Sequence, residues 1–293
     1  MAKYSHWRDG QHEALINILG EDNALALLRG EKAVSFQDVK LLHFDSNGRC
    51  IPRNLTNKVC DPNTDFHLVQ PKLDYGVRLA RIGECLHAGL MISAAEFEDR
   101  CQKLLERLGK DELCGNIVKA VHLPICIPQT QVTDYGEALN PFLLGVDCSY
   151  PQEFSGRTFN NYREDDLAKK VKIVPGIRHD ALVEKLAGGH AVGVYFPNPM
   201  QGFSVLAQRE QIEVLPPWFW LSGGFDAVTA MVAYPDVLAR DWSTPGLDFS
   251  ALQWQGARGS LYFKANDAEL KFDRGGNLGG SDDYYSGGLF VLG

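Results

Sequence analysis

Short runs of apolar and β-branched residues, each bounded by glycine, proline or polar residues, recur through the second half of the chain. Such runs are typical of β-strands, and they comprise Ala120–Ile127, Val171–Val174, His190–Phe196, Ser260–Lys264, Glu269–Phe272 and Leu289–Leu292. Two helical patterns interrupt them, over His179–Ala187 and Phe225–Ala239. Because strands and helices are mixed along the chain, the pattern favours an α+β fold built on a mixed-sheet α/β domain.

The clearest helix signal comes before these strands. Ser93 and Glu96 have the spacing of a capping box, in which each side chain bonds the backbone amide of the other. Apolar residues from Phe97 to Leu108 then recur on one face, and Gly109 stands where a left-handed cap often ends a helix. These residues predict a helix between Ser93 and Gly109.

The chain is expected to have four parts. Residues 1–44 contain two short helical patterns within Trp7–Gly30, which predict a small helical N-terminal module too small to be stable alone. Residues 45–75 are rich in Asn, Asp, Pro and Gly and predict an irregular linker. A helical segment over 76–117 and the mixed α/β domain over 118–293 complete the predicted organisation.

Charge and hydropathy argue against two classes of partner. The 293 residues carry 29 basic and 37 acidic side chains, a net charge of −8, and no run of five Lys or Arg occurs. Nucleic-acid binding uses clustered cations, so we expect none. No apolar run approaches the ~20 residues of a membrane-spanning helix, and the first residues lack a signal-peptide pattern. We therefore predict a cytoplasmic protein without membrane contact, and the oligomeric state stays open.

Cysteine usage and motif content bear on compartment and cofactors. Seven cysteines form no C-x-x-C pair, which predicts free thiols in a reducing compartment and no metal site. The chain has no Walker A, G-x-S-x-G, H-E-x-x-H or strand–GxGxxG–helix pattern, so we expect no cofactor. The glycine-rich stretch Gly275–Asp283 is a single copy of a pattern that binds calcium only when repeated, and it predicts a surface loop.

One pair of segments points to catalysis. Cys148 lies in Asp-Cys-Ser and His190 in Gly-His-Ala-Val-Gly-Val-Tyr, and a thiol nucleophile needs an imidazole to take its proton. These segments resemble the Cys and His motifs of papain-like, cell-wall-cleaving cysteine peptidases. The resemblance implies a thiol-dependent hydrolase using Cys148 and His190, with Gln201 or Asn198 as the orienting group. The composition after Cys148, including Pro151, instead predicts a loop, and Cys148 could simply be a small buried residue.

The leading hypothesis is a non-enzymatic binding or accessory protein. Trp218 and Trp220 flank Phe219, and neighbouring residues of a strand face opposite ways, so one ring should be exposed unless an interface covers it. The proline-containing stretch up to Phe203 offers a second apolar surface. We therefore expect Trp218, Trp220 and Phe203 to recognise a partner, which could be another protein. Alternatively, both tryptophans pack beneath the helix at Phe225–Ala239.

Two further segments, Leu25–Glu31 and Tyr195–Phe203, are similar to segments of bacterial proteins that have no assigned activity. The resemblance implies a bacterial cytoplasmic origin. It implies no function and no site residue.

Overall fold

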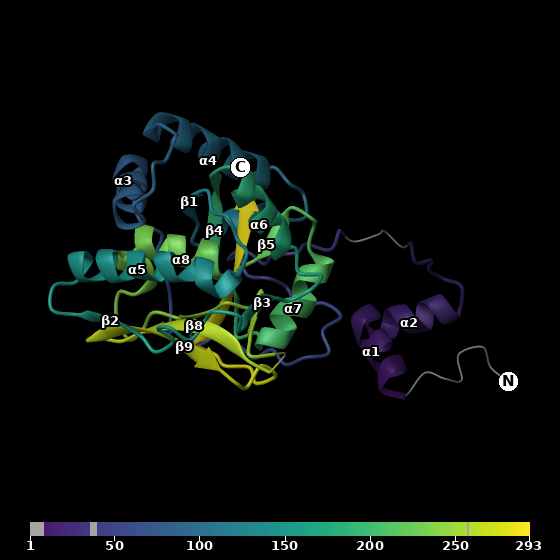
Figure 1. Ribbon diagram of the computed structural model, residues 1–293. Coiled ribbons are helices and arrows are strands. Elements are labelled where there is room, and N and C mark those ends of the chain that lie inside the picture. The colour runs from purple at the N-terminus through teal and green to yellow at the C-terminus, as the bar shows by residue number, and fades with distance from the viewer. Residues whose placement is uncertain (1–8, 36–39, 257) are drawn as a thin grey trace. The chain divides into compact units, whose positions relative to one another are not determined.

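The computed structural model describes residues 9–35, 40–256 and 258–293, and its contacts divide the chain into two compact units (Figure 1). The first unit is Met1–Leu41 and the second is Leu42–Gly293. Residues 45–75, which were expected to link two domains, therefore lie within the second unit. They contain no regular helix or strand up to the start of helix α3 at Tyr75.

The first unit contains the two short helices expected from the sequence, α1 (Asp9–Leu19) and α2 (Glu21–Leu28). Gly20 connects them with a φ of +78°, a backbone conformation that glycine adopts without strain. Trp7 and Arg8, part of the same prediction, lie outside the described residues. Among the side chains described in this unit only Ala26 is buried, while Ile18 and Leu28 are 81% and 85% exposed.

The second unit is built on a mixed sheet, which confirms the α+β class. Its central strands are β1 (Leu123–Ile127), β4 (Ala191–Gln201) and β10 (Tyr285–Leu292), all antiparallel. Beyond β10 the order continues through β6 (Gly246–Asp248), β8 (Ser260–Ala265), β9 (Glu269–Gly275) and β2 (Thr158–Asn161). The β10–β6 and β9–β2 pairs are parallel. β5 (Phe219–Leu221) also pairs with β10, and β3 (Val171–Ile173) pairs with β7 (Leu252–Trp254).

Helices bury both faces of the central strands. Tyr195 of β4 packs into one core with Phe142 and Phe225, whereas its neighbour Val194 packs into a second core with Phe97. The helices of this unit are α3 (Tyr75–Cys85), α4 (Ala94–Gly109), α5 (Tyr135–Glu153), α6 (His179–Gly188), α7 (Val205–Val214), α8 (Gly224–Ala233) and α9 (Pro235–Leu238), with a 3₁₀ turn at Gly115–Lys119. Successive side chains of β4 thus serve two cores, as its continuous apolar sequence requires.

Two helix predictions have different outcomes. Helix α4 is confirmed, and the Ser93 side chain accepts a hydrogen bond from the Glu96 amide as expected of its N-cap. The single helix predicted over Phe225–Ala239 is wrong, because α8 ends at Ala233 and α9 begins at Pro235. Proline has no amide hydrogen to donate to the preceding turn, so it starts a new helix there. No helix among the described residues is both long and apolar enough to cross a bilayer.

Helix α5 corrects the loop predicted after Cys148. It runs through Pro141 and Pro151 and packs closely on the end of α3, where a side chain at Gly145 would collide with Leu86. An interior proline costs about 3 kcal/mol of helix stability. Burial of α5 against its neighbours offsets this cost, which local sequence alone does not reveal.

A disulfide also joins α3 to α5. Cys85 is bonded to Cys148, with their Cα atoms 5.6 Å apart, well inside the usual range for a disulfide. The prediction of seven free thiols is therefore wrong for this pair, and the other five cysteines are free. The two partners are 63 residues apart, and sequence spacing carries no sign of such a pairing.

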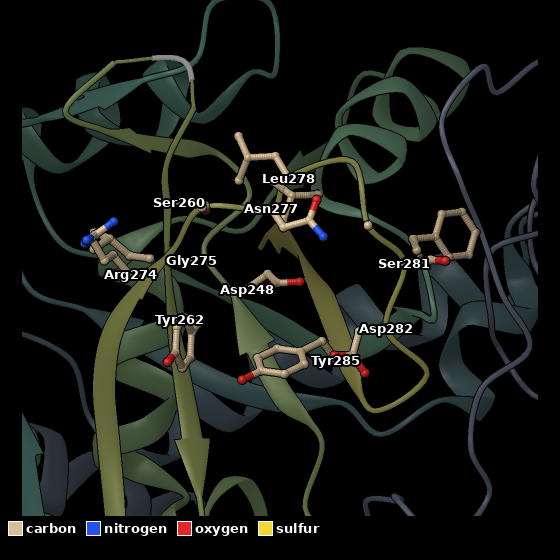
Figure 2. Close-up of a pocket in the computed structure, with 15 residues that line it drawn as sticks. Asp248, Ser260, Tyr262, Arg274, Gly275, Asn277, Leu278, Ser281, Asp282 and Tyr285 are labelled. Atoms are coloured by element: carbon tan, nitrogen blue, oxygen red, sulfur yellow. The ribbon is translucent and has the colours of Figure 1, made fainter.

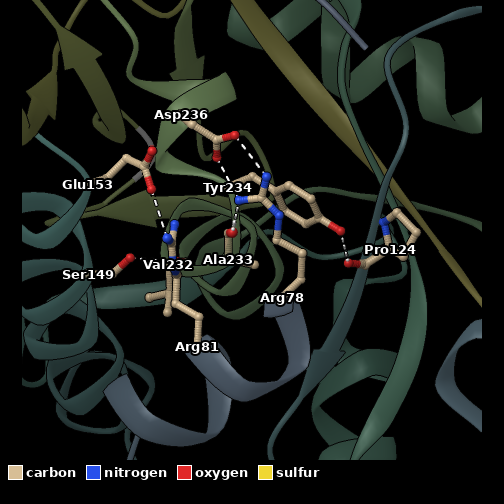
Figure 3. Close-up of polar contacts among 9 residues, drawn as sticks. All are labelled: Arg78, Arg81, Pro124, Ser149, Glu153, Val232, Ala233, Tyr234 and Asp236. Atoms are coloured by element: carbon tan, nitrogen blue, oxygen red, sulfur yellow. Dashed lines mark hydrogen bonds and ion pairs between the residues drawn. The ribbon is translucent and has the colours of Figure 1, made fainter. Parts of the chain in front are cut away.

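Arg78 of helix α3 also makes charged contacts with residues at the end of α8 and in α9 (Figure 3). The Arg78 guanidinium donates to both carboxylate oxygens of Asp236, at 2.7 and 2.8 Å, and to the Ala233 carbonyl at 2.8 Å. It also lies over the Tyr234 ring, 4.5 Å from its centre. This geometry fixes α3 at the point where α8 ends and α9 begins.

Candidate functional site

A polar cleft of about 320 Å³ opens at the β6, β8 and β10 side of the sheet (Figure 2). Asp248 lies at its centre, Tyr262 and Tyr285 form one side, and Asn277 and Leu278 lie across from them. Small-molecule sites commonly take this form, a concave surface with a few converging polar groups. The cleft is therefore the principal candidate site in the described part of the chain.

The short strand β6 brings Asp248 to this position. In the sheet Asp248 lies opposite Gly287 of β10 on one side and Tyr262 of β8 on the other. Gly287 has no side chain, and a Cβ there would collide with the amide of Gln208 on α7. The glycine is needed so that Gln208 can reach across β10 to Asp248.

A buried network holds the Asp248 carboxyl in place. Gln208 Nε2 donates to Asp248 Oδ2 at 3.0 Å and to the Phe203 carbonyl at 2.9 Å. The Ser250 hydroxyl donates to Gln208 Oε1, which fixes the orientation of the amide. Arg209 lies near Asp248, but its Nε and Nη2 donate hydrogen bonds to the carbonyls of Ser250 and Leu252, both at 2.8 Å. Among the described residues no cationic side chain forms an ion pair with Asp248.

The environment of Asp248 changes its acidity. The pKa of this carboxyl is raised to about 7, chiefly by burial and to a smaller extent by Asp282, while the Gln208 hydrogen bond and Arg209 act in the opposite direction. A carboxyl with an ordinary pKa is fully ionised at neutral pH, whereas this one exchanges its proton there. Such groups concentrate at functional sites.

The raised pKa predicts how stability depends on pH. The folded protein holds the Asp248 proton more tightly than the unfolded chain, so this stabilisation is complete below about pH 4 and is lost as pH rises through about 7. Asp248→Asn removes the loss, and we expect it to raise the free energy of unfolding at pH 8 by about 2 to 4 kcal/mol. Urea unfolding of both proteins at pH 5 and pH 8 measures this. Equal pH dependence in both proteins would contradict the raised pKa.

The glycine-rich stretch predicted to be a surface loop forms one wall of the cleft. Leu278 is buried, and its carbonyl accepts a hydrogen bond from the Leu206 amide at 3.1 Å. Opposite it, the rings of Tyr262 and Tyr285 meet edge to face with centres 5.6 Å apart. Tyr285 packs directly on Gly246, where a Cβ would strike the ring. The loop is therefore anchored over a preformed aromatic wall.

The three residues expected to form a recognition surface lie in different places and differ in exposure. Trp218 is 42% exposed and borders a hollow of about 270 Å³ with Leu108 on α4. Trp220 is half-buried, with its ring 6.1 Å from that of Phe290. Phe203 is buried and lines the Asp248 cleft. Trp218 is thus the one member of this set that presents an exposed ring.

The residues proposed for thiol catalysis do not form a catalytic arrangement in the structure. Cys148 is bonded to Cys85, so in this structure it has no thiol to activate. His190 immediately precedes β4 and is half-buried. The Gln201 amide is buried and donates to the carbonyls of Asn63, Phe66 and Asp283, at 3.2, 3.0 and 3.1 Å. Gln201 therefore connects two loops, the one that contains Asn63 and Phe66 and the one that contains Asp283.

A second polar cluster is sealed inside the protein. His179 Nε2 is 2.7 Å from the Tyr135 hydroxyl, which also accepts a hydrogen bond from the Gly224 amide at 3.0 Å. Nearby, the Gly223 amide donates to Asp226 at 2.9 Å. His179, Tyr135 and Asp226 are all buried, and burial lowers the pKa of His179. The cluster joins the first turns of α5, α6 and α8, and a ligand has no access to it.

Sequence reasoning missed the residues that converge on the cleft. Asp248 lies in Thr-Pro-Gly-Leu-Asp-Phe-Ser, Gln208 lies in a helix, and Tyr262 lies in a strand, and none of these segments forms a known motif. The glycine-rich loop was the only local signal near the site.

The described residues contain no group of three or more His, Cys, Asp or Glu side chains placed to hold a metal ion. The chain matches no protein-family model, no curated protein and no solved structure.

Proposed function

We propose that this protein is a non-enzymatic binding protein and that its ligand site is the cleft around Asp248. The observation that carries the proposal is the Asp248 carboxyl, which belongs to a half-buried residue, lines the cleft and forms no ion pair with a cation among the described residues. Burying an unpaired carboxylate is unfavourable, so a group kept in this state and facing a cavity is expected to meet a ligand.

The arrangement of the cleft supports binding more than catalysis. The Ser260 hydroxyl, which lines it, donates to the Phe249 carbonyl at 3.1 Å and is not held by a base. Asp248 is held from behind by Gln208, and Tyr262 and Tyr285 supply rigid apolar surface beside it. Rigid rings and a fixed polar anchor are features of selective small-molecule sites.

A cleft-filling substitution tests the proposal. Ser281 lines the cleft on the glycine-rich loop and is half-buried. Ligand-detected saturation-transfer NMR with a library of small fragments should find fragments that bind the full chain, lose binding to Ser281→Trp, and keep it with Ser281→Ala. Fragments that bind all three proteins equally well, or no bound fragment at all, would overturn the proposal.

A further inference from the structure

The charges that line the cleft are mostly negative. Asp248 and Asp282 both border it, and Arg274 is the one cationic side chain among its described lining residues. The Arg274 guanidinium stacks on Trp254, 5.1 Å from a ring centre, and in Figure 2 it points away from Asp248. The carboxylates therefore meet the cavity without a cation between them.

Arg209 acts on Asp248 from nearby, but its guanidinium donates to the carbonyls of Ser250 and Leu252, and it forms no ion pair with Asp248 in the described part of the chain. The charge of Asp282 favours the protonated form of Lys264, whose pKa burial lowers to about 8. Among the residues that the structure describes, the amide of Gln208 is the one side-chain hydrogen-bond donor to Asp248, at 3.0 Å. The uncompensated negative charge in the cleft is therefore chiefly that of Asp248.

One ring of the cleft wall, Tyr285, already lies near an ammonium group of the protein itself. Lys264 Nζ lies 4.6 Å from the ring centres of Phe66 and Tyr284 and 5.7 Å from that of Tyr285. Aromatic rings attract cations through their electron-rich faces. Tyr285 and its partner Tyr262 place the same kind of surface inside the cleft.

The donor set suits an organic cation better than a metal ion. Divalent metals take several oxygen ligands at short range, and no group of three metal-ligating side chains occurs among the described residues. One oxygen of Asp248 is also used by Gln208. A carboxylate beside two tyrosine rings is instead suited to an ammonium group with attached carbon atoms.

From these contacts we infer that the cleft binds a small organic ammonium ion, with Asp248 as its counter-ion and Tyr262 and Tyr285 packed against its carbon atoms. The inference rests on the proposed function of the cleft and specifies its ligand class. Cation binding favours ionised Asp248 and therefore releases its proton. The other titratable or charged groups that act on Asp248 or share the cleft wall with it are Arg209 of α7, Tyr262 of β8, Tyr285 of β10, Arg274 and Asp282.

Three probes of similar shape and different charge test this ligand class by isothermal titration calorimetry on the full chain. They are choline, its neutral carbon isostere 3,3-dimethyl-1-butanol, and the anion 3,3-dimethylbutanoate. We expect choline to bind at least about tenfold more tightly than the alcohol, and the anion not to bind. Because the charged form of Asp248 is required, choline affinity should rise about tenfold between pH 6 and pH 8.

Substitutions separate the roles of the acidic side chains. Asp248→Asn should abolish the preference for choline over the alcohol, and Asp282→Asn should weaken it less. Asp283→Asn removes the same charge next to the cleft lining and should leave the preference unchanged.

Two results would overturn the ammonium assignment. Equal binding of choline and the alcohol, lost in Ser281→Trp, would leave the proposed ligand site standing and exclude an ammonium ligand. Preferential binding of the anion, or no binding of choline at all, would exclude it as well, and the fragment experiment then decides separately whether the cleft binds ligands.

Discussion

Reduction of the Cys85–Cys148 disulfide is expected to lower the free energy of unfolding by about 3 to 4 kcal/mol. The bond joins residues 63 positions apart on α3 and α5, and closing a loop of this length restricts the unfolded chain strongly. Guanidinium unfolding with and without a thiol reductant measures the effect. Cys148→Ser should show the lower stability in both conditions.

A matched substitution controls for loss of a thiol alone. Cys60 is free and half-buried, so Cys60→Ser should change stability little and should remain sensitive to reductant. If the unmodified protein unfolds identically with and without reductant, the two cysteines are not bonded in solution. Cys148 would then again be available as a thiol, and the hydrolase hypothesis would regain its nucleophile.

Arg78→Met is expected to destabilise the protein by about 3 kcal/mol. The Arg78 side chain is 11% exposed and that of Asp236 is 30% exposed, so removing the guanidinium leaves a carboxylate and the Ala233 carbonyl without their donor in a poorly hydrated place. Breaking a buried pair typically costs 3 to 5 kcal/mol, and the partial exposure of Asp236 places this one near the lower limit. Urea unfolding at neutral pH measures the change.

Arg81 gives a control on the same helix. It makes a single hydrogen-bonded ion pair with Glu153 at 2.7 Å, and both side chains are more accessible than that of Arg78 (Figure 3). Arg81→Met should therefore cost about 1 kcal/mol. If both variants lowered the free energy of unfolding equally, the bidentate contact of Arg78 with Asp236 would contribute no more than the single contact of Arg81. A double-mutant cycle with Asp236→Asn measures the interaction energy of the Arg78–Asp236 pair itself.

The sequence predicts elements of this fold where local and tertiary preferences agree. The Ser93 cap, the apolar runs of β4 and β10 and the strands β8 and β9 all satisfy both. It fails where packing overrides local preference. Helix α5 accepts two prolines because its inner face is buried in the core, and three-residue strands such as β6 form beside longer strands.

The candidate site could not be predicted for a related reason. Asp248 acquires its properties from Gln208, which is 40 residues earlier, and from Asp282 on the loop before β10. Neither neighbour lies at a motif spacing from it, and the raised pKa exists only once the sheet has formed. The exposed Trp218 lies away from the cleft, and Tyr262 and Tyr285 occur in ordinary strand patterns.

The ionisation of Asp248 tests the account most directly. Carboxyl carbon NMR on ¹³C-labelled protein, with the signal assigned by its absence in Asp248→Asn, follows this single group as pH changes. We expect a midpoint at about pH 7, which choline moves to lower pH as it binds. A midpoint near pH 4, the ordinary value for an exposed aspartate, would show that water already solvates the carboxyl and would contradict the proposed site.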